Sequence, residues 1–178
     1  MKLFVVRHGE TNENIGKIMQ GNMDTVLNEK GREQAKIARD KLALENIDVI
    51  YASPKSRTRE TAEIISDGKI EILYDDRLKS RNHGEFEGMD RRTINLKDYW
   101  NYNLNMQYQS AESIRNLYDR VSNFLDMIKE KHNNQTVLIV THSGVCRILY
   151  YYFNGLPSDG DMLSGYEALN GLIEKYEL

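Results

Sequence analysis

Two histidines and two arginines lie just beyond the ends of short apolar runs in this 178-residue sequence. They are Arg7, His8, Arg57 and His142. A neutral imidazole can attack phosphorus and carry the phosphoryl group as a covalent intermediate. Guanidinium groups bind phosphoryl oxygens and neutralise charge that redistributes in the transition state. These residue types, if they meet, predict a site for a dense anion, most naturally a phosphoryl group.

Three continuous apolar runs predict strands that are buried on both faces, as in a parallel sheet. They span residues 3–6, 48–52 and 136–141, and a weaker, edge-like run at 70–74 is interrupted by Glu71. Helical patterns separate them, at about 29–45, from Pro54 to about 65, from 111 or 113 to 128, and from 144 to 153. Strands that alternate with helices predict an α/β fold, a three-layer sandwich whose mostly parallel central sheet has helices on both faces.

The predicted fold indicates where the reactive residues meet. Ligands of open α/β sheets bind beyond the carboxyl ends of the strands. If the strands before His8 and His142 are neighbours, their imidazoles can lie within several ångströms at a strand spacing of ~4.8 Å. Gly9 and Gly144 allow close backbone approach and precede predicted helix starts, whose N–H groups would add anion donors. The alternative is that each histidine is structural and that Arg57 pairs with Glu60 on its own helix.

Composition predicts one globular domain, 1–178, because 40% of the residues are hydrophobic, 29% are charged and no linker-like stretch interrupts the chain. A net charge of −3 argues against a nucleic-acid partner. The apolar start is too short for a signal peptide or membrane span. A single cysteine, Cys146, permits no internal disulfide, which favours a cytoplasmic location. Residues 76–110 are irregular and aromatic, and we expect them to form a cap over one end of the sheet.

Several motifs resemble the histidine phosphatase superfamily, which is also called phosphoglycerate-mutase-like, over nearly the whole chain. The segments that carry the resemblance are Arg7-His8-Gly9-Glu10-Thr11, Ser53-Pro54-Lys55-Ser56-Arg57 and Thr141-His142-Ser143-Gly144-Val145. The resemblance implies that His8 is the phosphorylated nucleophile and that Arg7, Arg57 and His142 hold the phosphoryl oxygens. It further implies a substrate-binding set of Asn14, Thr11, Gln20, Gly21 and Ser143. It implies no metal and no cofactor.

One position departs from the family pattern. Ser80 stands where the family usually has a glutamate acid/base, and a hydroxyl cannot replace a carboxyl as proton donor near neutral pH. Glu85 is our first candidate to replace it, because Glu85 lies nearest the expected loop; Glu87 and His83 are the alternatives. General acid catalysis is typically worth ~10²–10⁴-fold, so its loss would leave a slow enzyme.

The prediction is therefore a cytoplasmic phosphatase that hydrolyses small phosphomonoesters through a phosphohistidine, with a small phosphorylated metabolite as its partner and no nucleic acid or membrane. A phosphoglycerate mutase is an alternative that the short chain disfavours. A weakly catalytic phosphoester-binding protein is a second alternative, supported by Ser80. The sequence leaves the particular ester and the oligomeric state open.

Overall fold

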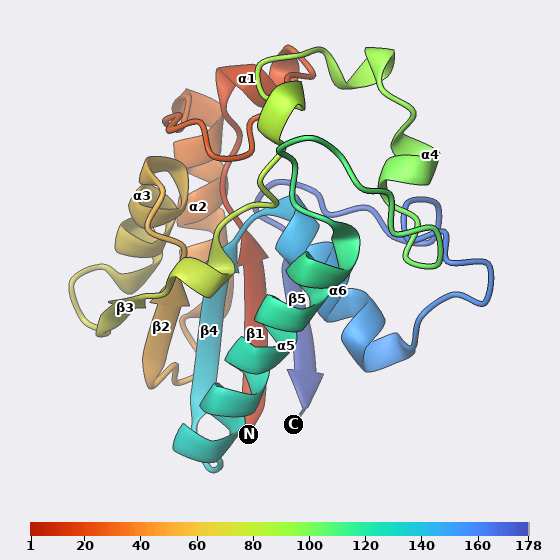
Figure 1. Ribbon diagram of the computed structural model, residues 1–178. Helices are drawn as coiled ribbons and strands as arrows, with labels where there is room; N and C mark the ends of the chain where they lie inside the picture. Colours follow the sequence, from red (N-terminus) through yellow and green to blue (C-terminus); the bar gives the residue numbers. More distant parts are fainter. Residues whose placement is uncertain (178) are drawn as a thin grey trace.

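The computed structural model describes residues 1–177 and is organised around a five-stranded sheet (Figure 1). The strands are β1 (Lys2–Arg7), β2 (Val49–Ala52), β3 (Ile72–Tyr74), β4 (Thr136–Thr141) and β5 (Ile173–Glu177). Their order is β3-β2-β4-β1-β5, and only the β1–β5 pairing is antiparallel. The predicted α/β class and mostly parallel central sheet are confirmed.

Neighbouring strands β1 and β4 determine where the reactive residues lie. They pair in parallel with Lys2 opposite Thr136 and Arg7 opposite Thr141, so both strands end at the same level. The next residue of each strand is a histidine, His8 or His142. Parallel pairing in this register therefore places the two histidines side by side at the carboxyl edge of the sheet.

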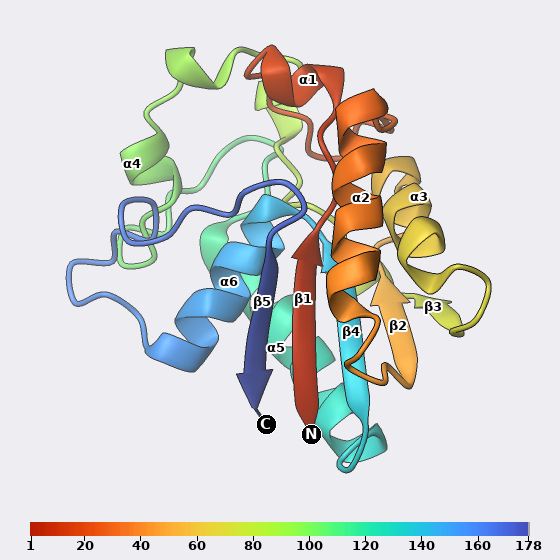
Figure 2. The ribbon, with the colours of Figure 1, turned by 180° about the vertical axis from the view of Figure 1, so that it is seen from behind.

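Helices cover both faces of the sheet, which confirms the three layers. One face packs on α2 (Glu29–Leu42) and α3 (Ser56–Ser66), and the other on α5 (Ile114–Lys131) and α6 (Ser143–Asn154) (Figures 1 and 2). Alternate strand residues point to opposite faces, so each strand contributes apolar side chains to both cores. The side chains of Asn28 and Ser113 cap α2 and α5 by accepting from backbone N–H groups.

Two details differ from the sequence prediction. Helix α3 begins at Ser56, after Pro54, because Lys55 is its N-cap and its carbonyl accepts the N–H groups of Thr58 and Arg59. The edge strand β5 was not predicted. Its sequence Ile-Glu-Lys-Tyr-Glu has only two apolar residues among five and has intermediate or exposed side chains throughout, so it lacks the continuous apolar run of a buried strand.

Between β3 and α5 the chain forms only short helical turns. They are η1 (Asp76–Leu78), η2 (Gly84–Phe86), η3 (Arg91–Thr93) and α4 (Leu96–Tyr99). With α1 (Asn12–Ile15), the turns η2, η3 and α4 lie beyond the carboxyl ends of the parallel strands, in the upper part of Figure 1, whereas η1 packs against α5. No helix within residues 1–177 is long and apolar enough to span a membrane.

Candidate active site

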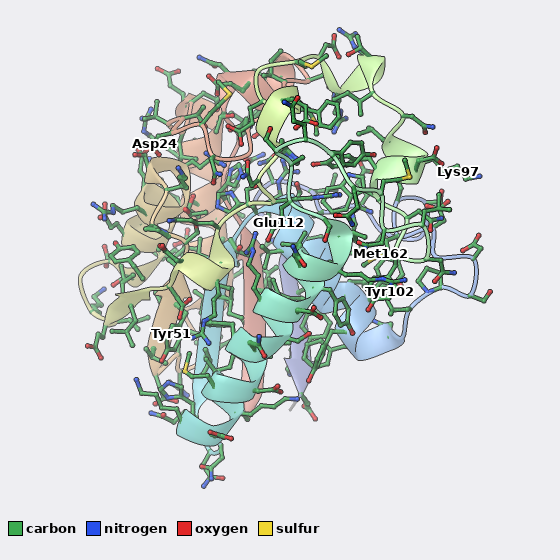
Figure 3. All side chains as sticks on the ribbon, in the orientation of Figure 1. Asp24, Tyr51, Lys97, Tyr102, Glu112 and Met162 are labelled. Atoms are coloured by element: carbon green, nitrogen blue, oxygen red, sulfur yellow. The ribbon has the colours of Figure 1, made fainter. Side chains whose placement is uncertain are left out.

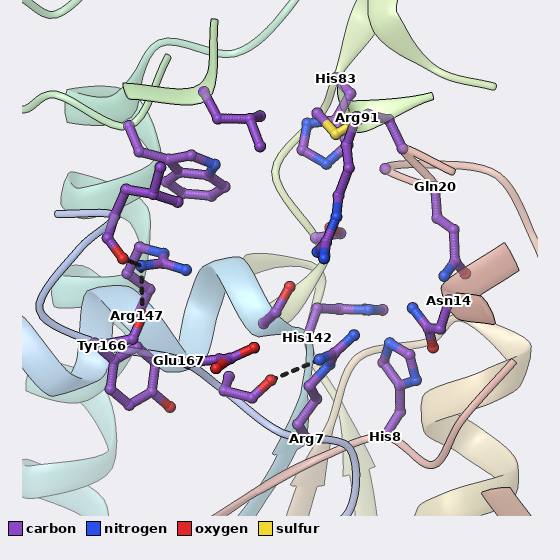
Figure 4. Close-up of a pocket in the computed structure, with 18 of the residues that line it drawn as sticks. Arg7, His8, Asn14, Gln20, His83, Arg91, His142, Arg147, Tyr166 and Glu167 are labelled. Carbon is purple, nitrogen blue, oxygen red and sulfur yellow. Dashed lines mark hydrogen bonds between the residues drawn. The ribbon is translucent and has the colours of Figure 1, made fainter. Parts of the chain in front are cut away.

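His8 and His142 meet at the carboxyl edge of the sheet. Their ring centroids are 5.3 Å apart at an interplanar angle of 66°, and both side chains are buried. They line a cavity of about 540 Å³, which is within the usual size of small-molecule sites. Figure 4 shows both rings on the floor of this cavity. The spacing expected for histidines at the ends of neighbouring strands is therefore present.

Backbone contacts orient the imidazole of His8. Its Nδ1 lies 2.7 Å from the carbonyl oxygen of Gly9. A carbonyl only accepts, so Nδ1 carries the proton and the lone pair is on Nε2. Burial, then the charges of Arg7 and Arg57, hold the pKa of His8 well below its ordinary value, so the ring is neutral. Gly9 passes close to the first turn of α2: a Cβ on Gly9 would lie 2.2 Å from the Gly31 carbonyl oxygen.

His142 presents its other ring nitrogen. Its Nε2 lies 2.8 Å from the Ser53 hydroxyl at the end of β2, while its Nδ1 is buried without a hydrogen-bond partner among the described residues. Burial, then Arg57, His8 and Arg7, hold the pKa of His142 well below its ordinary value. Buried polar atoms are normally paired, so an unpartnered ring nitrogen beside the cavity indicates a position for a ligand.

The guanidinium groups of Arg7 and Arg57 are held by backbone carbonyls. Arg57 Nη1 donates to Met23 O at 2.7 Å and Nη2 to Gly21 O at 3.0 Å, and Arg7 Nη1 donates to Ala168 O at 2.6 Å. In both residues Nε is buried and has no partner within residues 1–177. Burial lowers the pKa of each guanidinium to about 10, so both stay charged at neutral pH.

The sequence left open whether Arg57 pairs with Glu60 on its own helix, and the structure excludes this pairing. Glu60 accepts a hydrogen bond from Arg32 Nε at 2.5 Å, and Arg57 is only 1% exposed. Arg57 is therefore a buried cation beside the cavity and does not pair with Glu60 on the surface of its helix.

Four of the residues expected to bind substrate line the cavity: Asn14, Gln20, Gly21 and Ser143. The Asn14 side-chain oxygen accepts from the Thr11 N–H and the Asn170 amide, so its own amide N–H groups stay available. The Gln20 oxygen likewise accepts from Thr25. Ser143 is the first residue of α6, whose first-turn N–H groups lack intrahelical partners. These contacts leave donors at the cavity, as an anion requires.

Thr11 and Glu85 are not brought into the cavity lining. Thr11 is fully buried and caps α1, where its hydroxyl accepts from Asn14 N. The exposed Glu85 carboxylate accepts from the Ser110 hydroxyl and from the backbone N–H groups of residues 109–111. The bond from the Ser110 side chain is the largest of the effects that lower the pKa of Glu85 to about 2. A carboxylate in this environment is a poor proton donor, and the structure places Glu85 outside the cavity lining.

Glu87 is also engaged elsewhere. Its Oε1 accepts from Asn22 N at 2.8 Å and from His83 N at 3.2 Å, which ties two loops together. Gly21 has φ +47°, and a Cβ there would lie 2.3 Å from Glu87 Oε1. Glu87 therefore shapes the loop that carries Gln20 and Gly21. Ser80 does line the cavity, at the position where the family pattern has its acid.

The wall above the histidines comes from two loop regions and includes groups that the sequence did not single out as site residues. Arg147 Nη1 donates to three carbonyls, those of Met162, Leu163 and Tyr166, and so holds the loop before β5 against the cavity. Other lining residues of this wall are His83, Arg91, Leu96, Trp100 and Glu167 (Figure 4). His83 was an alternative proton donor in the sequence analysis, whereas the others follow no strand end, so the rule that located His8 and His142 does not find them.

Comparisons with known proteins agree with this site. Residues 3–163 match the model of the histidine phosphatase superfamily (branch 1), and the chain belongs to that family. It is 34% identical over 157 residues to phosphoserine phosphatase 1 of Hydrogenobacter thermophilus, covering 84% of this chain and 74% of that protein.

Two solved structures are also similar. Bacillus stearothermophilus YhfR matches with a TM-score of 0.90 and 30% identity, covering 99% of this chain and 91% of that one. Phosphoserine phosphatase from Entamoeba histolytica, in complex with 3-phosphoglyceric acid, matches with a TM-score of 0.85 and 26% identity, covering 98% and 89%.

Proposed function

We propose that this protein is a phosphatase that hydrolyses small-molecule phosphomonoesters through a phosphohistidine on His8. The observation that carries the proposal is a buried, neutral imidazole whose free Nε2 lies among cations and unpaired donors in one cavity. Membership of the histidine phosphatase superfamily and similarity to a protein named phosphoserine phosphatase support the same activity.

The first step uses the neutral state of His8. Nε2 attacks phosphorus opposite the ester oxygen, the P–N bond forms as the P–O bond breaks, and the alcohol leaves. Arg7, Arg57 and His142 bind the phosphoryl oxygens, where the unpaired Nε and Nδ1 atoms supply donors. Because these groups are already held by carbonyls and by Ser53, little reorganisation accompanies the reaction.

In the second step water attacks the phosphohistidine, and His8 is released as inorganic phosphate forms. Asn14, Gln20, Gly21 and Ser143 border the phosphoryl group in both steps. Within residues 1–177, no three His, Cys, Asp or Glu side chains lie together as a metal site would require.

The segment 76–110 serves as the cap in this proposal, because it supplies Ser80, His83, Arg91, Leu96 and Trp100 to the cavity wall. The substrate is a small phosphorylated metabolite, which the cavity volume of about 540 Å³ can hold. The similar structure from Entamoeba histolytica, which binds 3-phosphoglyceric acid, supports a substrate of this size. The buried, free thiol of Cys146 is compatible with a cytoplasmic location.

Trapping of the intermediate tests this proposal. Wild-type protein mixed with an aryl phosphate and quenched in alkali should carry one acid-labile phosphate on His8, located by mass spectrometry. His8→Ala should carry none and lose turnover by at least about 10³-fold, as expected for removal of a nucleophile. His132→Gln is a matched control, because His132 is also buried but hydrogen-bonds Tyr51 and Gln135 away from the cavity.

The same samples decide between phosphatase and mutase outcomes. Incubation with a metabolite phosphoester panel should release inorganic phosphate, with and without a chelator. Isomerised ester without released phosphate would favour a mutase. Tight ester binding with no turnover would favour a binding protein, and equal turnover of wild type and His8→Ala would refute the role of His8.

A further inference from the structure

The proposed phosphatase chemistry lacks an assigned proton donor for the leaving alcohol. Ser80 occupies the position of the family's acid, and the carboxylates of Glu85 and Glu87 are bound elsewhere. The remaining carboxylate in the cavity lining is Glu167, which is exposed and whose side chain has no hydrogen-bond partner among residues 1–177. A donor must be held in place, and the Tyr166 hydroxyl already donates to Glu174, so the choice falls on His83.

His83 is a buried and oriented side chain that lines the cavity. It is 8% exposed, and its Nδ1 lies 2.7 Å from the Tyr99 hydroxyl. Figure 4 shows His83 on the wall that faces His8 and His142 across the cavity. Because Nδ1 is engaged by Tyr99, the ring nitrogen that can exchange a proton with a ligand is Nε2.

Tyr99 is itself held firmly. It is 1% exposed, and the Arg81 guanidinium carbon lies 3.7 Å from its ring centroid while Arg81 Nη1 donates to its carbonyl oxygen at 2.6 Å. Phe86 packs edge-on against the same ring. The hydroxyl that contacts His83 therefore has a single position, which is how a proton-transfer group is usually oriented.

We infer that His83 is the general acid/base of this enzyme, in place of the missing carboxylate, with Tyr99 as its positioning residue. This inference rests on the proposed function. In the first step the proton on His83 Nε2 moves to the ester oxygen as the P–O bond breaks. In the second step His83 Nε2 takes a proton from the water that attacks the phosphohistidine. The proton enters with the monoanionic ester and leaves with phosphate, so no further reactant is needed.

The charges around His83 disfavour its protonated form until a substrate is bound. Burial, then Arg81 and Arg57, lower the pKa of His83 to about 3 in the free protein. Arg91 and Glu87 are the other charged groups near it, in the cavity wall and at its own backbone N–H. A bound phosphoryl dianion offsets the arginine charges, and this raises the proton affinity of His83 when the substrate is present.

The test compares esters whose alcohols differ in leaving ability. An aryl alcohol leaves without a proton, whereas an alkyl alcohol needs one. In His83→Gln, kcat/KM for an alkyl phosphate should fall about 10²-fold, and for an aryl phosphate much less, so the alkyl-to-aryl ratio drops at least tenfold. His132→Gln removes another buried histidine that bonds a tyrosine, 2.8 Å from the Tyr51 hydroxyl, and should leave the ratio unchanged. Tyr51, labelled in Figure 3, packs edge-on against Phe124 of α5 and lies outside the cavity lining.

Two further variants separate proton delivery from structure. Tyr99→Phe removes only the hydroxyl, and its ratio should fall about threefold to tenfold. Ser80→Glu in the His83→Gln background should restore alkyl turnover at least tenfold, because a carboxyl then stands in the same wall. A double variant no better than His83→Gln would show that the lost step is not proton delivery and would overturn the inference.

Each failure has its own signature. If aryl phosphate does not phosphorylate His8 in the wild type, the proposed function fails. If it does, and the ratio is the same in His83→Gln as in the wild type, only the role of His83 fails. Should His83→Gln not fold, the wild type still decides: kcat/KM that falls steeply with the pKa of the leaving alcohol, as without a catalyst, would overturn the inference, and a shallow dependence would support it.

Discussion

On the floor of the cavity, the nucleophile and the groups proposed to hold the phosphoryl oxygens stand at the ends of β1 and β4 or in the first turn of α3. On the opposite wall, His83, Arg91, Trp100 and Tyr166 come from irregular segments. The floor is therefore positioned by the sheet itself, and the wall by side chains such as Arg81 and Arg147 that bind carbonyls across loops. We therefore expect the residues of the floor to determine the type of reaction. The residues of the wall should determine which substrate binds and how the leaving group is protonated.

The largest effect should come from the floor. Arg57→Ala removes a preorganised cation, so we expect kcat/KM to fall about 10²–10³-fold. Arg59→Ala is the matched control on the same helix, where Arg59 lies over the Tyr74 ring at 4.8 Å, outside the cavity lining. Steady-state kinetics with one aryl phosphate measures both. Similar losses of kcat/KM in the two variants would show that Arg57 has no special role in the cavity.

The buried histidines should make stability depend on pH. His8, His142 and His83 have pKa values below their ordinary value in the folded protein, so the unfolded chain binds more protons below about pH 6.5. The free energy of unfolding should therefore be largest above that pH. It should fall as pH drops below about 6.5, down to about pH 3 for His83, by up to about 1.4 kcal/mol per pH unit for each histidine.

Urea unfolding at several pH values measures this slope. His83→Gln removes one of the three buried rings with lowered pKa and should make the slope shallower than in the wild type. Carboxylates with lowered pKa, such as Glu85 and Asp24, act in the same direction but only in more acidic solution. Stability that rises on acidification through pH 6 would contradict the neutral, buried state of these rings.

Removing a hydrogen-bond donor that holds the wall should weaken substrate binding more than it slows the chemical step. Arg147→Met leaves three carbonyls, those of Met162, Leu163 and Tyr166, without their donor, and we expect a loss of about 2 kcal/mol in unfolding free energy. KM should rise about tenfold with a smaller change in kcat. Arg115→Met is a control, because Arg115 also donates to loop carbonyls, of Tyr102 and Asn103, but outside the cavity lining. A fall in kcat with unchanged KM would contradict the view that the wall mainly binds substrate.

The smallest effect should come from Glu85. Glu85→Gln keeps the shape of a side chain that organises residues 109–111 and lies outside the cavity lining, so kcat/KM for alkyl and aryl phosphates should stay within about threefold of the wild type. Thermal unfolding should report a modest loss of stability. A hundredfold loss with the alkyl ester alone would instead return the proton-donor role to Glu85.

Much of the fold was predictable because its signals are local. The run Val137 to Val140 and its counterparts in β1 and β2 are continuous and apolar, as strands buried on both faces must be. Asn28 and Ser113 mark helix starts through their capping side chains. Strand β5 was missed because one of its faces is exposed and its pairing with β1 joins residues far apart in the chain.

In the candidate site, too, some residues could be placed from the sequence and others could not. The placement of His8 and His142 followed from the rule that parallel strands end together, and the motifs around them indicated the family. Thr11, by contrast, lies in the motif but caps α1, and Glu85 lies in the expected loop but binds the backbone N–H groups of residues 109–111. Nearness in sequence does not say which way a loop side chain points, since that depends on the donors it meets in the folded chain.

The sequence by itself determined the α/β layers, the edge of the sheet where chemistry occurs and the residue types that meet there, because strand periodicity and parallel topology dictate them. Only the tertiary structure decided which loop groups face the cavity. It turned Glu85 outward toward backbone donors and His83 inward beside Tyr99. The physical reason is that loop side chains are directed by hydrogen bonds to residues distant in sequence, and these contacts leave no periodic pattern in the chain.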